Sequence, residues 1–314
     1  MNETKIRYKG RLGQTLIYLG KQLRMFLYQN DWKVLPMSAI IAGLVTFVVG
    51  ANLFVYQEGT LTGSFALVCV CIWNGCFNSI QSVCRERAIV KREHRAGLHA
   101  SSYILSQMLY QLMLCLCQTL VTMIVCQVAG VHFPKQGIIF PWGMADLSVT
   151  IFLITYSSDM LALMISCIVR NTTTAMTVMP FVMIFQLVFS GGFFQLEGLA
   201  AKAEVLTISH WGLDAMCAIG RYNELPMVTL WNTLFKFKDI AVEGQKPLLD
   251  VILMMQEQNT VMDFLLWSGT YNTNGIYAST VANVLKNWGG IALHTVIYVV
   301  AAGVALKFID RDKR

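Results

Sequence analysis

The sequence predicts an all-α polytopic membrane protein. Hydrophobic residues make up 55% of the 314 residues and charged residues only 13%, whereas soluble domains carry about 25% charged residues. The charges are also clustered, because five long stretches contain no Asp, Glu, Lys or Arg: 34–57, 59–84, 96–134, 171–196 and 287–306. Each stretch can hold the ~20 apolar residues that cross a bilayer as a helix.

Length and hydropathy predict six transmembrane helices. We expect them at about 36–56, 64–83, 103–128, 147–169, 175–194 and 289–308. Glu58, Gly59 and Gly63 mark the expected short connection between the first two helices. The expected organisation is a cytoplasmic helix, five spans, an outer (extracytoplasmic) insertion, and a sixth span with a cytoplasmic tail, at 1–34, 35–195, 196–287 and 288–314.

The distribution of charge predicts the orientation, because cytoplasmic flanks of spans carry the excess of Lys and Arg. Of the 24 Lys and Arg residues, 17 lie before the first span, after the second, after the fourth or after the sixth, with only six of the 18 Asp and Glu residues. We therefore expect a multi-pass plasma-membrane protein with both termini in the cytoplasm. Topology accounts for the net charge of +6, so no nucleic-acid partner is expected.

An amphipathic helix is predicted ahead of the first span. Its apolar residues recur at steps of three and four, and they are Leu12, Leu16, Leu19, Leu23 and Phe26. Two roles fit this pattern equally well. The helix is either an anchor on membrane lipid, with Lys and Arg toward anionic head groups, or a lever that lies along the cytoplasmic surface.

The loop between the second and third spans, 84–102, is dense in charge of both signs. We expect it to be helical up to about Arg95 and to break at Gly97. Glu86 and Glu93 are seven residues apart and therefore share one helical face. A segment that only halts movement of the chain through the membrane needs basic residues and no acidic ones. Glu86 and Glu93 are therefore predicted to form ion pairs in a cytoplasmic contact between helices.

The outer insertion is too polar to cross the membrane, yet it is not an ordinary loop. Segments 203–219 and 249–267 mix apolar runs with single charges, which predicts helices that lie at the outer leaflet or dip partly into it. Residues 264–285 carry no charge but are rich in Thr, Asn, Gly, Ser and Tyr. We interpret them as folded outer structure and not as a seventh span.

Patterns for ATP binding and catalysis are absent from the sequence. It contains no G-x-x-x-x-G-K-[ST] loop, no H-E-x-x-H or G-x-S-x-G, and no cluster of metal-ligating residues. We therefore expect no catalytic residue, metal or cofactor in this chain. Eight of the nine cysteines lie in or beside spans and are expected to pack as small apolar residues. Cys217 lies in the insertion and has a second possible role, a disulfide between two copies of the chain.

Asp159 is the one carboxylate well inside a predicted span. Burying an acid there costs at least ~2.5 kcal/mol on insertion scales, so it is a functional candidate. The competing interpretation is a structural acid, hydrogen-bonded to Tyr156, Ser157 or Ser158 or to a neighbouring helix. A single acid without a basic partner is a thin basis for proton coupling.

Three groups of residues follow one another along the chain in the order found in a known family. Glu86-Arg87 is followed by Lys91-Arg92-Glu93 and by Ser-Ser-Tyr at 101–103. The fifth expected span ends in Ser190-Gly191-Gly192-Phe193-Phe194, and the insertion holds Ile208-Ser209-His210-Trp211-Gly212-Leu213-Asp214-Ala215 and then Tyr222-Asn223-Glu224-Leu225. With the leading amphipathic helix and six spans, the chain resembles the permease of an ABC exporter of the G subfamily, the white and pleiotropic drug resistance type, and its bacterial relatives.

The resemblance implies a membrane subunit that works as a dimer with a second permease protomer, identical or different. ATP and Mg are implied on a separate ABC ATP-binding subunit. The resemblance assigns coupling to that subunit to Glu86, Arg87, Arg92 and Glu93, next to the amphipathic helix. It places a substrate pocket between the second and fifth spans of both protomers, lined by Asn74, Phe77, Asn78, Phe181, Phe185 and Phe189, for which packing is the alternative role.

The expected function is that of a permease that moves an amphipathic or lipophilic substrate out of the cytoplasm or inner leaflet by alternating access. One alternative is a secondary transporter that uses Asp159. Another is a non-transporting membrane scaffold or immunity protein that acts through the outer insertion.

Overall fold

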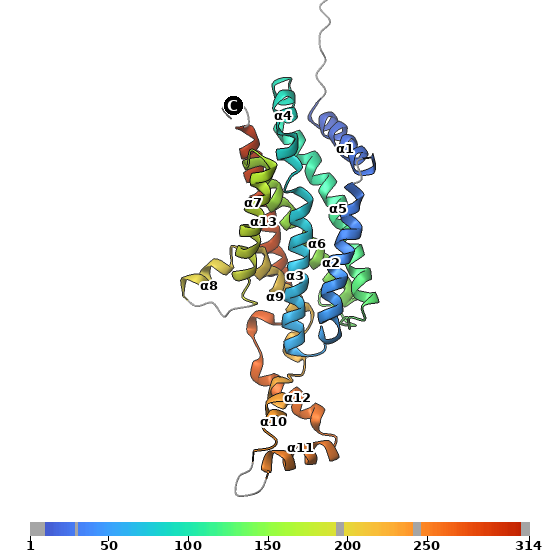
Figure 1. Ribbon diagram of the computed structural model, residues 1–314, viewed down its shortest axis with the longest axis vertical. Coiled ribbons are helices and arrows are strands. Elements are labelled where there is room, and N and C mark those ends of the chain that lie inside the picture. The colour runs from blue at the N-terminus through green and yellow to red at the C-terminus, as the bar shows by residue number, and fades with distance from the viewer. Residues whose placement is uncertain (1–9, 29–30, 193–197, 241–245, 309–314) are drawn as a thin grey trace, which may run out of the picture.

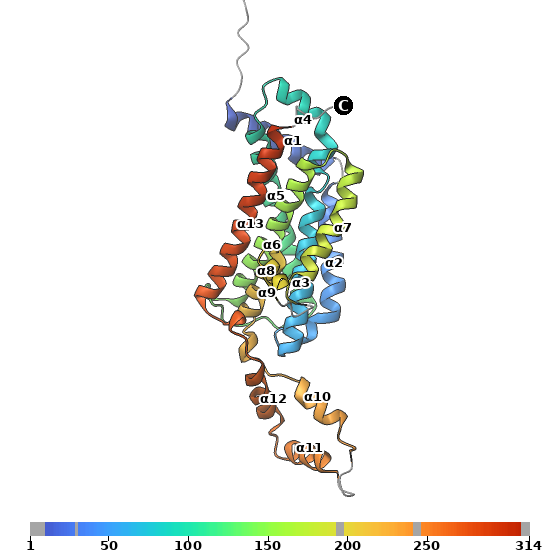
Figure 2. The ribbon, with the colours of Figure 1, turned by 90° about the vertical axis from the view of Figure 1, so that its left-hand side faces the viewer.

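The computed structural model describes residues 10–28, 31–192, 198–240 and 246–308. In these residues the regular structure is entirely helical. Long helices form an elongated bundle, with short helices at each end (Figures 1 and 2). Five helices of the described residues are long and apolar enough to cross a membrane, which agrees with the predicted fold class. They occupy Val34–Asn52, Gln57–Arg95, Ala100–Val128, Gly143–Ile168 and Val281–Lys307.

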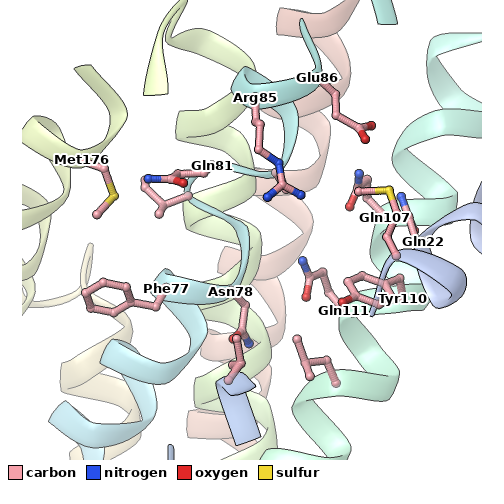
Figure 3. Close-up of a pocket in the computed structure, with 15 residues that line it drawn as sticks. Gln22, Phe77, Asn78, Gln81, Arg85, Glu86, Gln107, Tyr110, Gln111 and Met176 are labelled. Carbon is pink, nitrogen blue, oxygen red and sulfur yellow. The ribbon is translucent and has the colours of Figure 1, made fainter. Parts of the chain in front are cut away.

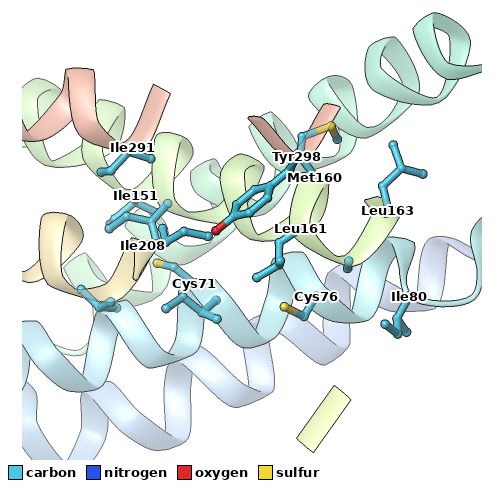
Figure 4. Packing of buried hydrophobic residues seen from close by; sticks show 14 of the residues in the cluster. Cys71, Cys76, Ile80, Ile151, Met160, Leu161, Leu163, Ile208, Ile291 and Tyr298 are labelled. Carbon is cyan, nitrogen blue, oxygen red and sulfur yellow. The ribbon is translucent and has the colours of Figure 1, made fainter. Parts of the chain in front are cut away.

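The centre of the bundle is α6 (Gly143–Ile168), which packs against α3 (Gln57–Ser79) on one side and α13 (Val281–Lys307) on the other. The helices α2 (Val34–Val49) and α5 (Ala100–Val128) complete the bundle around α3 and α6. Figure 4 shows the core where α3, α6 and α13 meet, with Ile80, Ile151, Met160, Leu163 and Ile291 among its buried residues. The predicted amphipathic helix is α1 (Arg11–Tyr28), and the charged loop holds α4 (Ser82–Arg95).

The second span begins earlier than predicted. Gly59 and Gly63, expected in a connection, lie inside α3, which starts at Gln57. A Cβ on Gly59 would lie 2.4 Å from the carbonyl oxygen of Asn52 and one on Gly63 would lie 2.7 Å from Leu53. The glycines therefore let the preceding turn pack directly onto the helix. They mark a close contact and not a break.

The fifth predicted span corresponds to α7 (Thr172–Val188), which has 17 residues. At 1.5 Å per residue it is about 25 Å long, shorter than the ~30 Å hydrocarbon core. It is apolar but falls below the length of the five spanning helices. The helix ends early because the chain turns at Ser190 and Gly191, whose φ is +74°. The six-span count therefore stays a prediction, and Phe193 and Phe194 lie outside the described residues.

After α7 the chain folds back into the bundle. Following α8 (Leu199–Glu204), α9 (Ile208–Ile219) packs against α3, α6 and α13, and most of its residues are fully buried. The Gln186 side-chain oxygen accepts hydrogen bonds from the backbone N–H groups of Ile208 (2.9 Å) and Ser209 (3.3 Å), so α7 caps the start of α9. The predicted helix at 203–219 thus corresponds to α9 from Ile208 onward, and it packs in the core of the bundle.

The rest of the insertion extends from one end of the bundle as three short helices, α10 (Thr229–Lys236), α11 (Pro247–Glu257) and α12 (Val261–Gly269) (Figure 1). The helix predicted at 249–267 is divided between α11 and α12 because Asn259 adopts a positive φ of 54°. Residues 264–285 form no separate span, but α13 starts at Val281 rather than near Gly289, capped by the Thr280 side chain. The last residues assigned to the insertion therefore belong to the final spanning helix.

Candidate functional site

The amphipathic helix α1 packs beside α4 and α5 at the end of the bundle opposite to α10–α12 (Figures 1 and 2). Its contact face is polar, since Thr15 is 3% exposed and Gln22 is 8% exposed. Leu12 and Leu16 of the predicted apolar stripe are 75% and 66% exposed. The leucines at the start of α1 therefore point away from the protein, as they would toward lipid.

Glu86 and Glu93 both face α1. Lys21 Nζ lies 3.0 Å from Glu86 Oε2, and the Tyr18 hydroxyl donates a hydrogen bond to the Glu93 carboxylate. Burial raises the pKa of the Tyr18 hydroxyl, and the hydrogen bond to Glu93 raises this pKa further. The hydroxyl therefore stays protonated at neutral pH and remains a donor. The two acids that share a face of α4 thus bind two residues one turn apart on α1.

The turn after α4 also contacts α1. The Gln14 amide donates to the Gly97 carbonyl oxygen (3.2 Å), and its oxygen accepts from the backbone N–H of His99 (3.0 Å). Thr15 donates to the carbonyl oxygen of Ser102 at the start of α5 (3.3 Å). Gly97 has φ +107°, which glycine adopts without strain. The α1–α4 junction, defined as these contacts with the Lys21–Glu86 and Tyr18–Glu93 pairs, therefore joins α1 along its length to the loop.

Arg87 connects α4 to the central helix. Its guanidinium donates to the carbonyl oxygens of Cys167 (2.9 Å) and Val169 (3.0 Å) at the end of α6. The Ser166 hydroxyl accepts from the backbone N–H groups of Val83 and Cys84, both at 3.1 Å, and so caps the first turn of α4. The start of α4 is therefore hydrogen-bonded to the end of α6. Arg92 is exposed on α4, and the structure does not bring it into this junction.

A cavity of about 340 Å³ adjoins the α1–α4 junction. It is lined by residues of α1, α2, α3, α4, α5 and α7, and Figure 3 shows part of this lining. Most of its labelled side chains are polar: Gln22, Asn78, Gln81, Arg85, Glu86, Gln107, Tyr110 and Gln111. The Gln22 and Gln111 side-chain oxygens are buried without a hydrogen-bond partner among the described residues. Such an atom costs about 1–3 kcal/mol.

The structure brings only two of the six predicted pocket residues to this cavity. Phe77 and Asn78 line it, and Asn78 exchanges hydrogen bonds of 2.8 and 3.0 Å with the Gln118 amide of α5. Asn74 is only 5% exposed. On α7, Phe181 is 70% exposed and Phe185 is 39% exposed.

Phe189 caps the end of α7, with its ring centroid 4.8 Å from that of Phe185. These three Phe residues form an apolar face of α7 apart from the cavity, open to lipid or to another chain. Neither the charged residues nor the spacing of the phenylalanines predicts the cavity amides. The signal for them was the uncharged polar spacing of Gln107, Gln111 and Gln118 on one predicted span.

Asp159 is completely buried where α3, α5 and α6 meet. Its carboxylate accepts hydrogen bonds from the Ser79 hydroxyl and from the Cys115 thiol (3.3 Å). The three neighbours considered from the sequence have other acceptors, since Tyr156, Ser157 and Ser158 donate to backbone carbonyl oxygens. The partners come from neighbouring helices, so Asp159 joins three helices.

A second group of titratable residues lies at the start of α9. The His210 ring lies 3.7 Å from the Asp214 carboxylate and 3.9 Å from that of Glu204. Burial, and then the neighbouring Glu204, raises the pKa of Asp214 to about 8, while burial lowers the pKa of His210. Both groups are therefore largely neutral at pH 7, as their burial requires.

Cys217 on the same helix is fully buried against Phe65, Leu213 and Tyr222. A disulfide between two copies would require this cluster to open. Among the described residues, no set of three or more His, Cys, Asp or Glu side chains is placed to hold a metal ion.

Comparison with known proteins adds two findings. Residues 14–218, from α1 to the end of α9, match the family model described as ABC-2 type transporter. Over 150 residues the chain is 27% identical to a protein of Mycobacterium tuberculosis described as an ABC transporter ATP-binding/permease protein. That similarity covers 47% of this chain and 17% of the relative, so the chain spans about a sixth of the relative's length.

Proposed function

The chain belongs to the ABC-2 type transporter family, and from this premise we propose that it is the permease subunit of an ATP-driven exporter of the G-subfamily type. In this proposal a separate ATP-binding subunit binds ATP and Mg, and two permease protomers form the pathway. The substrate is an amphipathic or lipophilic molecule that leaves the cytoplasm or the inner leaflet by alternating access. The α7 helix also crosses the membrane, which brings the number of crossings to six. The α1–α4 end faces the cytoplasm.

The observation that supports this proposal most directly is the α1–α4 junction. Glu86 and Glu93 fasten α4 to α1, and Arg87 fastens it to α6. A push on this end by a partner subunit would be passed to the central helix through hydrogen bonds and not through a flexible loop. A rigid element that connects two sites is what mechanical coupling needs.

The relative's description supports an ATP-binding function that works together with the permease. The relative is described by both an ATP-binding and a permease function, whereas this chain carries no phosphate-binding loop in its sequence. The ATP-binding function is therefore assigned to another polypeptide or to a part of the protein beyond these 314 residues. The alternative function is a proton-coupled transporter that uses Asp159. The Asp159 carboxylate bonds to Ser79 and Cys115 of the helices packed around it, as a structural acid does.

The test is ATP turnover by the complex. The full chain is purified from its native membrane with its ATP-binding partner and reconstituted in liposomes. We expect Glu86→Lys combined with Glu93→Lys to lower substrate-stimulated ATP turnover by at least about tenfold, which corresponds to about 1.4 kcal/mol in activation free energy. The charge reversal would separate α4 from Lys21 and Tyr18.

Asp250→Lys with Glu257→Lys is the matched control. These acids have the same seven-residue spacing, are exposed, and lie on α11 at the opposite end of the molecule. We expect this variant to keep its ATP turnover. Unchanged turnover in the Glu86/Glu93 variant would contradict the coupling role. Transport that runs without ATP and is lost in Asp159→Asn would replace the proposal with the proton-coupled rival.

A further inference from the structure

The three short helices α10, α11 and α12, with the described residues between them, form a projecting module whose apolar side chains are left uncovered. All eight residues of α10 are described, and none of them is buried, although the helix is amphipathic. In α11, which is also described throughout, Ile252 is the single buried residue. Apolar surface exposed in this way marks an interaction site. The large apolar residues of the module that are each 43–55% exposed include Phe235, Phe237, Leu253, Met254, Met262 and Leu266.

The position of the module leaves water or protein, and not lipid, to face these side chains. The module extends from one end of the bundle along the long axis of the molecule, beyond the ends of the spanning helices (Figures 1 and 2). The Glu58 carboxylate of α3 accepts hydrogen bonds from the backbone N–H groups of Val228 (3.1 Å) and Thr229 (2.8 Å) at the start of α10. The Gln57 amide donates to the carbonyl oxygen of Gly269 at the end of α12 (3.0 Å). Both ends of the module are therefore bound to the same helix.

The charges of the module are separated by sign. Basic residues lie at the end of α10 and acids on α11 and α12, and they are Lys236, Lys238, Asp250, Glu257 and Asp263. Asp239 and Lys246, between α10 and α11, pair with each other at 2.9 Å. Among the described residues, none of the other five forms an ion pair. The charges that could neutralise one another within the module therefore stay apart.

A two-fold axis between two copies would bring these opposite charges together. In such a pair, residue i of one copy contacts residue j of the other, and j contacts i in return. Because α10 packs beside both α11 and α12, α10 of one copy can face α11 and α12 of the other while the reverse contact forms. The basic end of each α10 then meets acids, and the apolar side chains between them are covered.

We propose that the projecting module is a contact surface for a second copy of this chain, with the basic end of α10 against the acidic α11 and α12 of the other copy in both directions. The apolar residues form the centre of the contact and the charges its rim, as in other protein interfaces. The contact rests on the proposed function, in which two permease protomers form the pathway. It lies at the end of the molecule opposite to the α1–α4 junction, so ATP turnover does not depend on it.

The experiment measures self-association of the purified full chain in detergent, by fluorescence energy transfer between donor and acceptor proteins fused to the N-termini of two preparations. Lys236→Glu with Lys238→Glu, and separately Glu257→Lys with Asp263→Lys, place like charges against each other. Each double variant is expected to raise the Kd of association at least about tenfold. Mixing the two double variants brings opposite charges together in both halves of the contact, so the mixed pair should return to the Kd of the parent chain.

Lys135→Glu with Lys202→Glu is the matched control. Both lysines are exposed and both lie outside the module, so this variant should keep the Kd of the parent chain. Thermal unfolding of every variant checks that it is folded. The proposal is overturned if the reversed-charge variants associate as the control does, or if the mixed pair stays as weak as either variant alone.

The outcomes separate this contact from the permease role. If all variants pair with the Kd of the parent chain, the protomers meet elsewhere; the module contact is then wrong and the permease proposal stands. If the parent chain does not associate, a second copy is not the partner of the module. The ATP turnover of the Glu86 and Glu93 variant tests the permease proposal independently, because it measures an effect at the other end of the molecule.

Discussion

Gly75 shows how far a single residue controls the contact between two helices. A Cβ at this position would lie 2.2 Å from the carbonyl oxygen of Thr155 and 2.9 Å from the backbone nitrogen of Asp159, both on α6. Any side chain would therefore push α3 away from the central helix. Helices in membranes associate through small residues of this kind, which allow the backbones to approach closely.

We therefore expect Gly75→Ala to lower the free energy of unfolding by about 1–3 kcal/mol, the usual cost of an overpacked core. Gly289→Ala on α13 is the matched control, since nothing lies within 4 Å of its Cβ position. Ala favours helix over Gly by up to about 1 kcal/mol, so the control keeps or raises the stability. Unfolding of both variants in detergent measures the difference, and equal stabilities would show that the close contact has no energetic role.

At the scale of elements, polar contacts join α1 to the loop, and Phe26 of its apolar stripe packs against Tyr110 of α5 with the ring centroids 6.4 Å apart. Gln14, Thr15, Tyr18 and Lys21 all bond to the loop or to the start of α5. Polar contacts that are partly exposed are individually weak. These contacts join α1 to α4 while Leu12 and Leu16 point away from the protein. The two roles predicted for this helix, anchor and lever, are compatible in this arrangement.

The Lys21–Glu86 pair gives a direct test of this arrangement. Lys21→Glu and Glu86→Lys each place like charges together, so hydrogen exchange of the α1 amides should become faster in both single variants. The double variant restores an opposite pair and should recover the slow exchange. Because the Lys21 side chain is 36% exposed, we expect a coupling energy of only about 0.2–1 kcal/mol.

Lys246→Glu, which breaks the exposed Lys246–Asp239 pair of 2.9 Å near α11, is the control for that experiment. It should leave exchange in α1 unchanged. A double variant that exchanges as fast as the single variants would mean that the contact between Lys21 and Glu86 does not hold α1 in place.

At the scale of the whole molecule, the chain places its charged loop and its projecting helices at opposite ends of the bundle (Figures 1 and 2). The α4 end carries Arg85, Arg87, Lys91, Arg92 and Arg95. The positive-inside rule predicts that this end faces the cytoplasm, and the geometry then predicts that α10–α12 lie outside.

Cysteine labelling of intact cells tests this orientation. A membrane-impermeant maleimide should label Lys246→Cys from outside, because the position is exposed next to α11. Lys91→Cys on α4 should react only after the cells are opened. The parent chain gives the background from its own cysteines. The reverse pattern would place the α1–α4 junction outside and remove the basis for a cytoplasmic ATP-binding partner.

The sequence by itself determined the helical membrane fold, the approximate regions of five spanning helices and the shared face of Glu86 and Glu93. These properties depend on local hydrophobicity and helical period, which any single segment displays. The sequence-based prediction placed the starts of α3 and α13 too late, because glycines and uncharged polar residues inside these helices were interpreted as connecting segments. Family motifs spread along the chain added the transporter class, although each is short.

Only the tertiary structure decided which polar residues meet. It turned α9 into a core helix, ended α7 after 17 residues, and gave Asp159 its partners on α3 and α5. It also gathered Gln22, Gln107 and Gln111 from two helices around one cavity. The sequence shows that these amides interrupt apolar segments, but their hydrogen-bond partners depend on residues distant in sequence. Such a site therefore exists only once the helices have packed.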